Sequence, residues 1–194
     1  MLFRSVASGD VYSYYVDIQT PELLSDGKIL GFWERVTSIY GGQSDSKYLV
    51  GLGTWKILRD QYVWTDSNGR KRNTRSDRSI TLIKPESITE KAVNAILDKL
   101  GKKPLFGHKE HNWEWIYSDD YRSYQLCTNT YDKVDSDVLV YVKSTNPQTN
   151  ASFIRFYLVS LDTHEVEDDL RKDLVLSPES LAEAIFNKTA ALVK

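Results

Sequence analysis

Sulfur is nearly absent from this sequence: Cys127 is the only cysteine and Met1 the only methionine in 194 residues. A single cysteine excludes any disulfide within the chain. This fits a reducing compartment, and it equally fits a secreted domain that folds without disulfides. The thiol content therefore does not decide the compartment.

The sequence also lacks an excess of charge and any long hydrophobic run. It has 25 basic and 27 acidic residues, for a formal net charge of −2. A chain this close to neutral has no overall attraction to nucleic acid or to an anionic membrane, so we expect neither partner. No apolar run approaches the roughly 18 residues that indicate a membrane span. Apolar residues make up 41% and charged residues 27%, a balance typical of globular proteins.

Recognisable catalytic signatures are missing. There is no Gly-x-Ser-x-Gly motif, and Gly51-Leu52-Gly53 lacks the further glycine and the helix of a phosphate-binding loop. Cys127 is the obvious nucleophile to test, but it falls on a strand of alternating residues, where a buried, inert thiol is the commoner case. We predict that the protein is not an enzyme and uses no cofactor.

Two groups of residues have the side chains of a metal site without its spacing. His108 and His111, with Glu114 three residues on, offer the right ligand types for zinc, but the pattern of zinc proteases is absent. The acidic run at 165–169 lacks the glycine of a calcium-binding EF-hand loop. We interpret the first as a solvated linker and the second as a solvated acidic hairpin, and we predict no metal site.

The N-terminal residues do not form a signal peptide. Residues 1–5 have no basic region followed by an apolar stretch. Met1 stands almost directly before a strand-like run. We expect that a secretory leader was removed ahead of this point, which places the protein in the cell envelope or outside the cell. A plain cytoplasmic start is the alternative.

Short segments rich in aromatic and β-branched residues alternate with turn signals in the first half. This pattern predicts strands at 11–18, 28–36, 48–58, 61–65 and 79–83, with turns at Asp26-Gly27 and at 66–69. The period then changes. Apolar residues from Ile88 to Leu100 recur every three or four positions, Pro85 suits a first turn, and Gly101 suits a C-cap. We predict one helix there.

The second half repeats this plan. Residues 177–183 resemble residues 84–90, at a separation of 93, and residues 118–124 resemble residues 8–14, at a separation of 110. We also align 29–33 with 138–142. We predict an α+β fold of two tandem repeats, each a mainly antiparallel sheet with a C-terminal helix packed on it. The repeats are 1–101 and 111–194, joined by a linker at 102–110. The first has about 17 extra residues, a basic hairpin insert at about 60–78.

Several motifs of both halves resemble surface-adhesin-E-like domains, which are small secreted bacterial domains. The matching segments are 14–17, 29–35, 66–70 and 83–87 in the first half, and 113–118 and 176–180 in the second. The chain departs from the family pattern, which often has cysteines in the sheet and near the final helix. Here Cys127 stands alone, at the place where the first half has Asp17. The resemblance implies the fold and a secreted or envelope-associated binding module of unknown ligand.

The basic stretch that starts at Arg70 is the most distinctive local charge. The candidate ligand-binding residues are Tyr62, Trp64, Arg70, Lys71, Arg72, Arg75 and Arg78. Cations mixed with aromatic rings suit a sulfated glycan or the surface of a host or envelope protein. The same pattern also describes an edge hairpin that charge protects against aggregation.

Two functional hypotheses remain open from the sequence. The first is a non-enzymatic, secreted or cell-envelope binding module of the adhesin-like type. The alternative is an intracellular interaction or scaffold protein without a small-molecule ligand. No motif indicates an oligomeric state.

Overall fold

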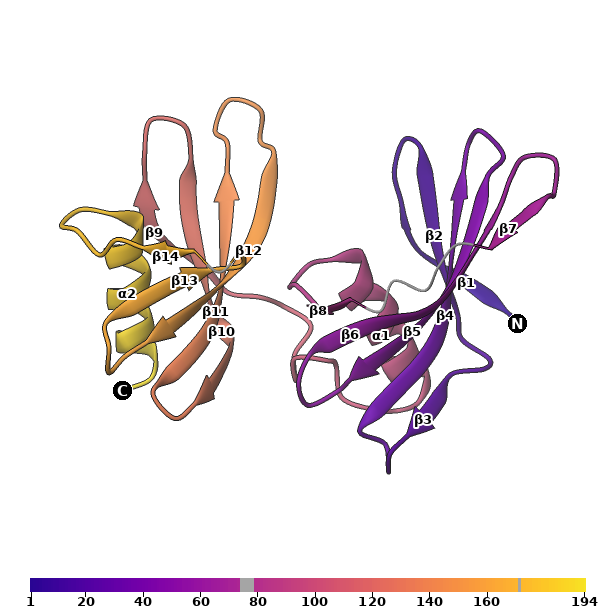
Figure 1. Cartoon of the computed structure of the whole chain (residues 1–194), viewed down its shortest axis with the longest axis horizontal. Coiled ribbons are helices and arrows are strands. Elements are labelled where there is room, and N and C mark those ends of the chain that lie inside the picture. The colour runs from indigo at the N-terminus through magenta and orange to yellow at the C-terminus, as the bar shows by residue number, and fades with distance from the viewer. Residues whose placement is uncertain (74–78, 171) are drawn as a thin grey trace. The chain divides into compact units, whose positions relative to one another are not determined.

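The computed structural model describes residues 1–73, 79–170 and 172–194. The chain divides into two compact units, Met1–Lys109 and Glu110–Lys194. In each unit, an antiparallel sheet carries a helix that follows its last strand (Figure 1). The predicted α+β class with mainly antiparallel sheets is confirmed.

The sheet of the first unit runs in the order β1-β2-β4-β5-β6-β7, with β3 beside β4 and β8 beside β6. Its described pairings are all antiparallel. The elements are β1 (Phe3–Ser8), β2 (Tyr12–Asp17), β3 (Glu22–Leu24), β4 (Ile29–Ser38), β5 (Gln43–Gly51), β6 (Lys56–Thr65), β7 (Lys71–Asn73), β8 (Ile80–Leu82) and α1 (Ile88–Lys99).

One predicted strand of the first unit, 48–58, is wrong. The structure divides it into the end of β5 at Gly51 and the start of β6 at Lys56, which pair with each other as a hairpin. The turn between them contains Gly53, and Trp55 completes it with a φ of 53°. Because the apolar residues on both sides of the turn form one run in sequence, their alternation concealed it.

The core of the first unit lies between α1 and one face of the sheet. Val16, Leu30 and Phe32 supply the sheet side, and Val93 and Ile96 belong to the helix. Alternation along β4 points every second side chain to this face. Burial of these side chains stabilises the helix, because a helix of 12 residues is only marginally stable by itself.

Two residues of the predicted linker at 102–110 lie in this core. Leu105 is 6% and Phe106 9% exposed. The Leu105 N–H donates to Asn94 Oδ1 at 2.8 Å, and the ring of Phe106 meets that of Trp55 edge-on at 4.9 Å. These two side chains therefore belong to the first unit and not to a solvated connection, since their apolar surface is buried there.

The sheet of the second unit runs in the order β9-β10-β11-β12-β13-β14, again antiparallel throughout its described pairs. Its core includes Leu126, Val138 and Val140 from the sheet and Ile185 from the helix. The elements are β9 (Trp113–Ser118), β10 (Ser123–Val134), β11 (Asp137–Thr145), β12 (Ser152–Ser160), β13 (Glu165–Asp168), β14 (Asp173–Leu174) and α2 (Leu181–Leu192).

Both helices begin with a reciprocal capping arrangement. The Oγ of Ser87 accepts a hydrogen bond from the Glu90 N–H at 3.1 Å, and the Glu90 carboxylate accepts one from the Glu86 N–H at 2.6 Å. Ser180 and Glu183 form the same pair at the start of α2, at 3.1 Å. These bonds satisfy N–H groups that have no partner inside the helix, so they fix where each helix starts.

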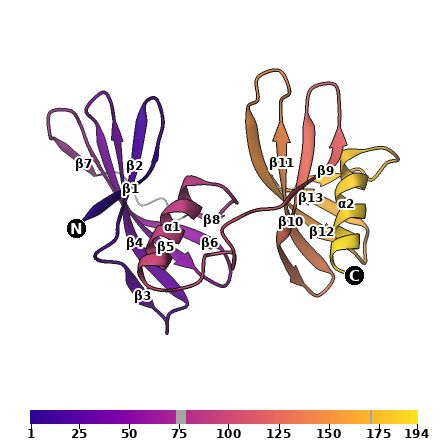
Figure 2. The same ribbon diagram turned by 180° about the vertical axis from the view of Figure 1, so that it is seen from behind.

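The sheets extend beyond their helices. In Figures 1 and 2, the hairpins β1–β2, β4–β5 and β6–β7 pass the end of α1, and the hairpins β9–β10 and β11–β12 pass the end of α2. One end of each sheet face is thus left without a helix on it. Within the described ranges, neither length nor hydropathy qualifies any helix as a transmembrane span.

Candidate functional site

The end of the first sheet that α1 leaves open forms a hollow of about 390 Å³. Alternation along β4 leads from Phe32, which is buried under α1, to Val36, which lines the hollow. The aromatic lining comes from Tyr12, Tyr40, Tyr62 and Trp64. Tyr12 is 50% and Tyr40 77% exposed, so their rings are accessible to a ligand.

A β-bulge in β6 places one cation beside this aromatic lining. Tyr48 pairs with Arg59 and Lys47 with Gln61, so Asp60 is an extra residue in the ladder. The bulge brings Arg59 and Tyr62, three residues apart, to the same face of the sheet. The Arg59 guanidinium carbon lies 5.0 Å from the centre of the Tyr62 ring. A cation at this distance is attracted by the ring.

The turn of the β6–β7 hairpin has the predicted form. Asp66 Oδ1 accepts hydrogen bonds from the N–H groups of Asn68 and Arg70, both at 2.9 Å. Gly69 has a φ of 77°, a conformation that glycine adopts without steric cost. The Asp66 N–H donates to the Arg70 carbonyl at 3.0 Å and closes the loop. The turn therefore presents an ordered backbone at the rim of the hollow, which Asp66 and Ser67 line.

The structure brings part of the predicted site together. Tyr62 and Trp64 lie in the hollow, while Arg70 and Lys71 are exposed at the turn and at the start of β7. Arg72 pairs with Trp64 in the ladder. The remaining two predicted residues, Arg75 and Arg78, lie outside the described residues.

Glu34 lies between the core and the hollow, on the same face as both. The residue is only 7% exposed, and among the described residues none forms a hydrogen bond with its carboxylate. Burial raises its pKa to about 7, because the charged form loses its hydration. Burial, followed by the nearby Glu34 charge, also raises the pKa of Tyr48. A carboxyl group beside the hollow therefore titrates close to neutral pH.

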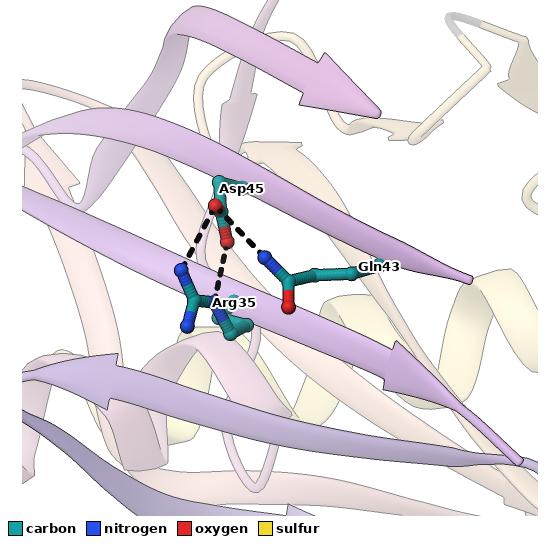
Figure 3. Close-up of polar contacts among 3 residues, drawn as sticks. All are labelled: Arg35, Gln43 and Asp45. Carbon is teal, nitrogen blue, oxygen red and sulfur yellow. Dashed lines mark hydrogen bonds and ion pairs between the residues drawn. The ribbon is translucent and has the colours of Figure 1, made fainter. Parts of the chain in front are cut away.

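On the opposite face of the same sheet, three polar side chains form hydrogen bonds with one another. Arg35 donates two parallel hydrogen bonds to Asp45, from Nε to Oδ1 at 2.8 Å and from Nη2 to Oδ2 at 3.0 Å (Figure 3). Gln43 Nε2 also donates to Asp45 Oδ2, at 3.1 Å. The bond to Asp45 raises the pKa of Arg35. The guanidinium also lies 4.2 Å from the Phe3 ring centre. We interpret this cluster as a structural tie between β1, β4 and β5.

The residues that the sequence offered for metal or nucleophile chemistry have other partners. His111 Nδ1 lies 2.9 Å from the Thr130 hydroxyl, and Glu114 pairs with Lys188. Among the described residues, no group of three or more His, Cys, Asp or Glu side chains could hold a metal ion. Cys127 is fully buried, and its thiol donates to Asn129 Oδ1 at 3.4 Å.

Sequence reasoning missed Tyr12 and Tyr40, which line the hollow, and Arg59 and Glu34, which lie beside it. Tyr12 appeared only as one position in a strand pattern, and Glu34 was not distinguished from its neighbours. The pairing of β2 with β4 brings Tyr12 into the hollow and Glu34 beside it, since Tyr12 pairs with Ser38 and Val16 with Glu34. The Tyr12/Tyr14 alternation signalled an aromatic face, but no local pattern placed that face beside Trp64.

No family model matches the chain, and no curated protein matches it.

Proposed function

We propose that this protein is a non-enzymatic binding module and that its ligand is a sulfated glycan held in the hollow of the first unit. The observation that carries the proposal is the convergence of Tyr12, Tyr62 and Trp64 on one hollow, beside the turn that carries Arg70 and Lys71. These residues come from two distant stretches of sequence.

The chemistry of the hollow suits such a ligand. Aromatic rings offer large, rigid faces at a low cost in side-chain entropy, and the flat C–H faces of sugar rings pack on them. Exposed arginine and lysine side chains bind sulfate groups through charge-assisted hydrogen bonds. The volume of about 390 Å³ falls in the range of small-ligand sites, and it accommodates one or two sugar units of a longer chain.

A secreted or cell-envelope location belongs to this proposal. It rests on the resemblance of both halves to surface-adhesin-E-like domains. The competing function is an intracellular interaction or scaffold protein, in which the charged hairpin only protects a sheet edge. A search for glycan binding separates the two.

We also infer that the two units are tandem copies of one ancestral unit. Three kinds of correspondence support this. The helix caps Ser87 and Ser180 use the same reciprocal bonds. The first hairpin of each unit closes through a backbone hydrogen bond between residues three apart, Gly9 to Tyr12 (2.8 Å) and Asp119 to Arg122 (2.9 Å).

The third correspondence is a cation over the aromatic ring that begins each sheet. Arg35 covers Phe3 and Lys143 covers Trp113, each at 4.2 Å from a ring centre. The copies differ in the length of chain at the position of the hairpin β6–β7. The paired strand residues Ile57 and Thr81 are separated by 24 residues, and the matching pair Val166 and Leu174 by 8. The basic hairpin is then an addition specific to the first copy.

The test is calorimetric titration of the full chain with a heparin oligosaccharide at physiological salt. We expect saturable binding that weakens by about tenfold in the double variant Arg70→Ser/Lys71→Ser and in Tyr12→Ala. Lys102→Ser/Lys103→Ser removes the same charge from an exposed site away from the hollow, and Trp115→Ala removes an exposed aromatic ring from the second unit. Both controls should keep the affinity. Absence of heparin binding, or equal losses in the controls, would reject the proposed function.

A further inference from the structure

The second unit has a hollow of its own, of about 410 Å³, lined in part by the first residue of α2, Leu181. Two arginines enter it from different elements, Arg122 before β10 and Arg155 on β12. Both approach the same ring: their guanidinium carbons lie 4.6 Å and 5.3 Å from the centre of Phe153. Two cations thus share one aromatic platform.

Arg155 has unused hydrogen-bonding capacity. Its contacts with Asp168 and Asp169 are 3.9 Å and 4.0 Å long, beyond the range of a charge-assisted hydrogen bond. None of the described residues accepts a hydrogen bond from this guanidinium. Asp168 is held elsewhere, because its Oδ1 accepts from the N–H groups of Leu170 (2.9 Å) and Lys172 (3.1 Å). The fork of donors on Arg155 is therefore available to a planar acceptor.

Arg122 is positioned by contacts that leave part of its fork open. Its Nη1 donates to the hydroxyl of Ser144, another lining residue, at 3.0 Å, and this bond holds the side chain in the hollow. The nearby carboxylate of Asp119 is occupied, since it accepts from the N–H groups of Tyr121 and Arg122 and from the hydroxyl of Tyr124. It therefore belongs to the turn and does not neutralise the open donors by a direct bond.

The fold itself does not require these cations. Arg155 pairs with Val142 in the second sheet. At the corresponding pair of the first sheet, Ser46 takes the place of Arg155 and Glu34 that of Val142. Tyr12 takes the place of Arg122 in the first unit. Its carbonyl accepts from the Gly9 N–H, as the Arg122 carbonyl accepts from the Asp119 N–H. The first sheet thus forms the same ladder without either guanidinium, so the strand pairing does not depend on this pair.

We propose that this second hollow binds a small organic carboxylate with an apolar body, such as an aromatic acid. The carboxylate accepts hydrogen bonds from Arg122 and Arg155, which match its planar geometry. The apolar body packs against Phe153, Leu174 and Leu181. A single negative charge is preferred, because a dianion such as a phosphate monoester would face the charges of Asp168 and Asp169 beside Arg155. This site and its ligand are independent of the glycan site of the first unit.

The test is a titration of the ¹⁵N-labelled full chain with sodium benzoate at pH 7.5. We expect saturable shifts of the backbone amides of Arg122, Phe153 and Arg155, with a Kd of about 1 mM or lower. Benzyl alcohol, which has the same ring without the charge, should bind at least about tenfold more weakly. Phenyl phosphate should also bind more weakly than benzoate.

Variants assign the effect to the two guanidinium groups. Arg122→Gln and Arg155→Gln should each weaken benzoate binding by about tenfold, and Arg155→Lys, which keeps the charge but not the fork, should also weaken it. Arg4→Gln removes an exposed arginine of the first unit and should have no effect. The dispersion of the same spectra shows whether each variant is folded. Equal affinity for benzyl alcohol, shifts confined to other residues, or no saturation by about 50 mM would overturn the proposal.

Discussion

Glu34 and Val142 occupy the same place in their two sheets. Glu34 pairs with Val16 on β2, and Val142 pairs with Leu126 on β10. Val16 and Leu126 are both fully buried core residues. The first unit therefore holds a carboxyl group where the second has an apolar side chain. Burying this group in its charged form has a cost in desolvation free energy, and the valine of the second unit has no such cost.

This difference predicts a pH-dependent stability of the first unit. The pKa of Glu34 is about 7 in the folded state, against 4.5 for an unburied glutamate, so the folded state binds this proton more tightly. The Glu34 contribution is most favourable below pH 4.5 and is lost as the pH rises to about 7. The loss amounts to about 3 kcal/mol. Denaturation midpoints measured from pH 4.5 to 8 should show it.

Glu34→Gln removes the titrating group and should flatten this part of the pH profile. The variant should also be more stable than the wild type at pH 8. Asp26→Asn is the control, because it removes an exposed carboxylate from a turn of the same unit, at a φ of 55° that asparagine tolerates. If the profile of Glu34→Gln keeps the wild-type slope, Glu34 is not the group responsible.

The helix caps make a second prediction. Ser87→Ala and Ser180→Ala each leave an N–H of the first helical turn without its side-chain acceptor. Each should lower the free energy of unfolding of its own unit by about 1 kcal/mol, and replacement by Asp should restore most of it. Urea denaturation measures the change. Ser177→Ala is the matched control, since its exposed side chain caps no helix; a loss as large there would contradict the assignment.

A helix after residue 84 was predictable because its signals are local, but its start was predicted too early. Pro85, expected in the first turn, lies before the N-cap Ser87, and α1 begins at Ile88. Pro85 and Ser87 precede a run with helical spacing, and the same signals precede α2. The strand alignment between the halves was less secure. Leu30 was aligned with Leu139, yet Leu30 and Val138 are the residues with no exposure that face their cores. A slip of one residue moves every side chain of a strand to the other face, and hydrophobic runs without strict alternation cannot reveal it.

The candidate site was predictable only in part, for the same reason. Tyr62 and Trp64 lie on one strand and next to a recognisable turn, so sequence could associate them. Tyr12 and Glu34 come from other strands, and the pairing that brings them in depends on long-range contacts. The bulge at Asp60, which turns Arg59 to the same face, has no signature in the sequence.

The pair of Arg35 and Asp45 gives a third prediction. Its two parallel hydrogen bonds and partial burial, with side chains 33% and 25% exposed, should make it stronger than an ordinary surface pair. A double-mutant cycle with Arg35→Met and Asp45→Asn should give a coupling free energy of about 1 kcal/mol in urea denaturation. The pair Lys109 and Asp98, with both side chains 64% exposed, is the comparison. It should show weaker coupling that added salt removes; equal coupling in the two pairs would refute the interpretation.

The burial of Leu105 and Phe106 predicts where the first unit can be cut. A fragment of residues 1–109 should unfold cooperatively, whereas a fragment of residues 1–101 loses both side chains from its core and should be less stable by about 3 kcal/mol or more. Urea denaturation followed by tryptophan fluorescence measures this, because Trp55 contacts Phe106 directly. In the full chain, Leu105→Ala/Phe106→Ala should reproduce the loss, and Lys102→Ser/Lys103→Ser should not. Equal midpoints for the two fragments would instead show that the segment after Gly101 is a linker, because a true linker adds no buried apolar surface.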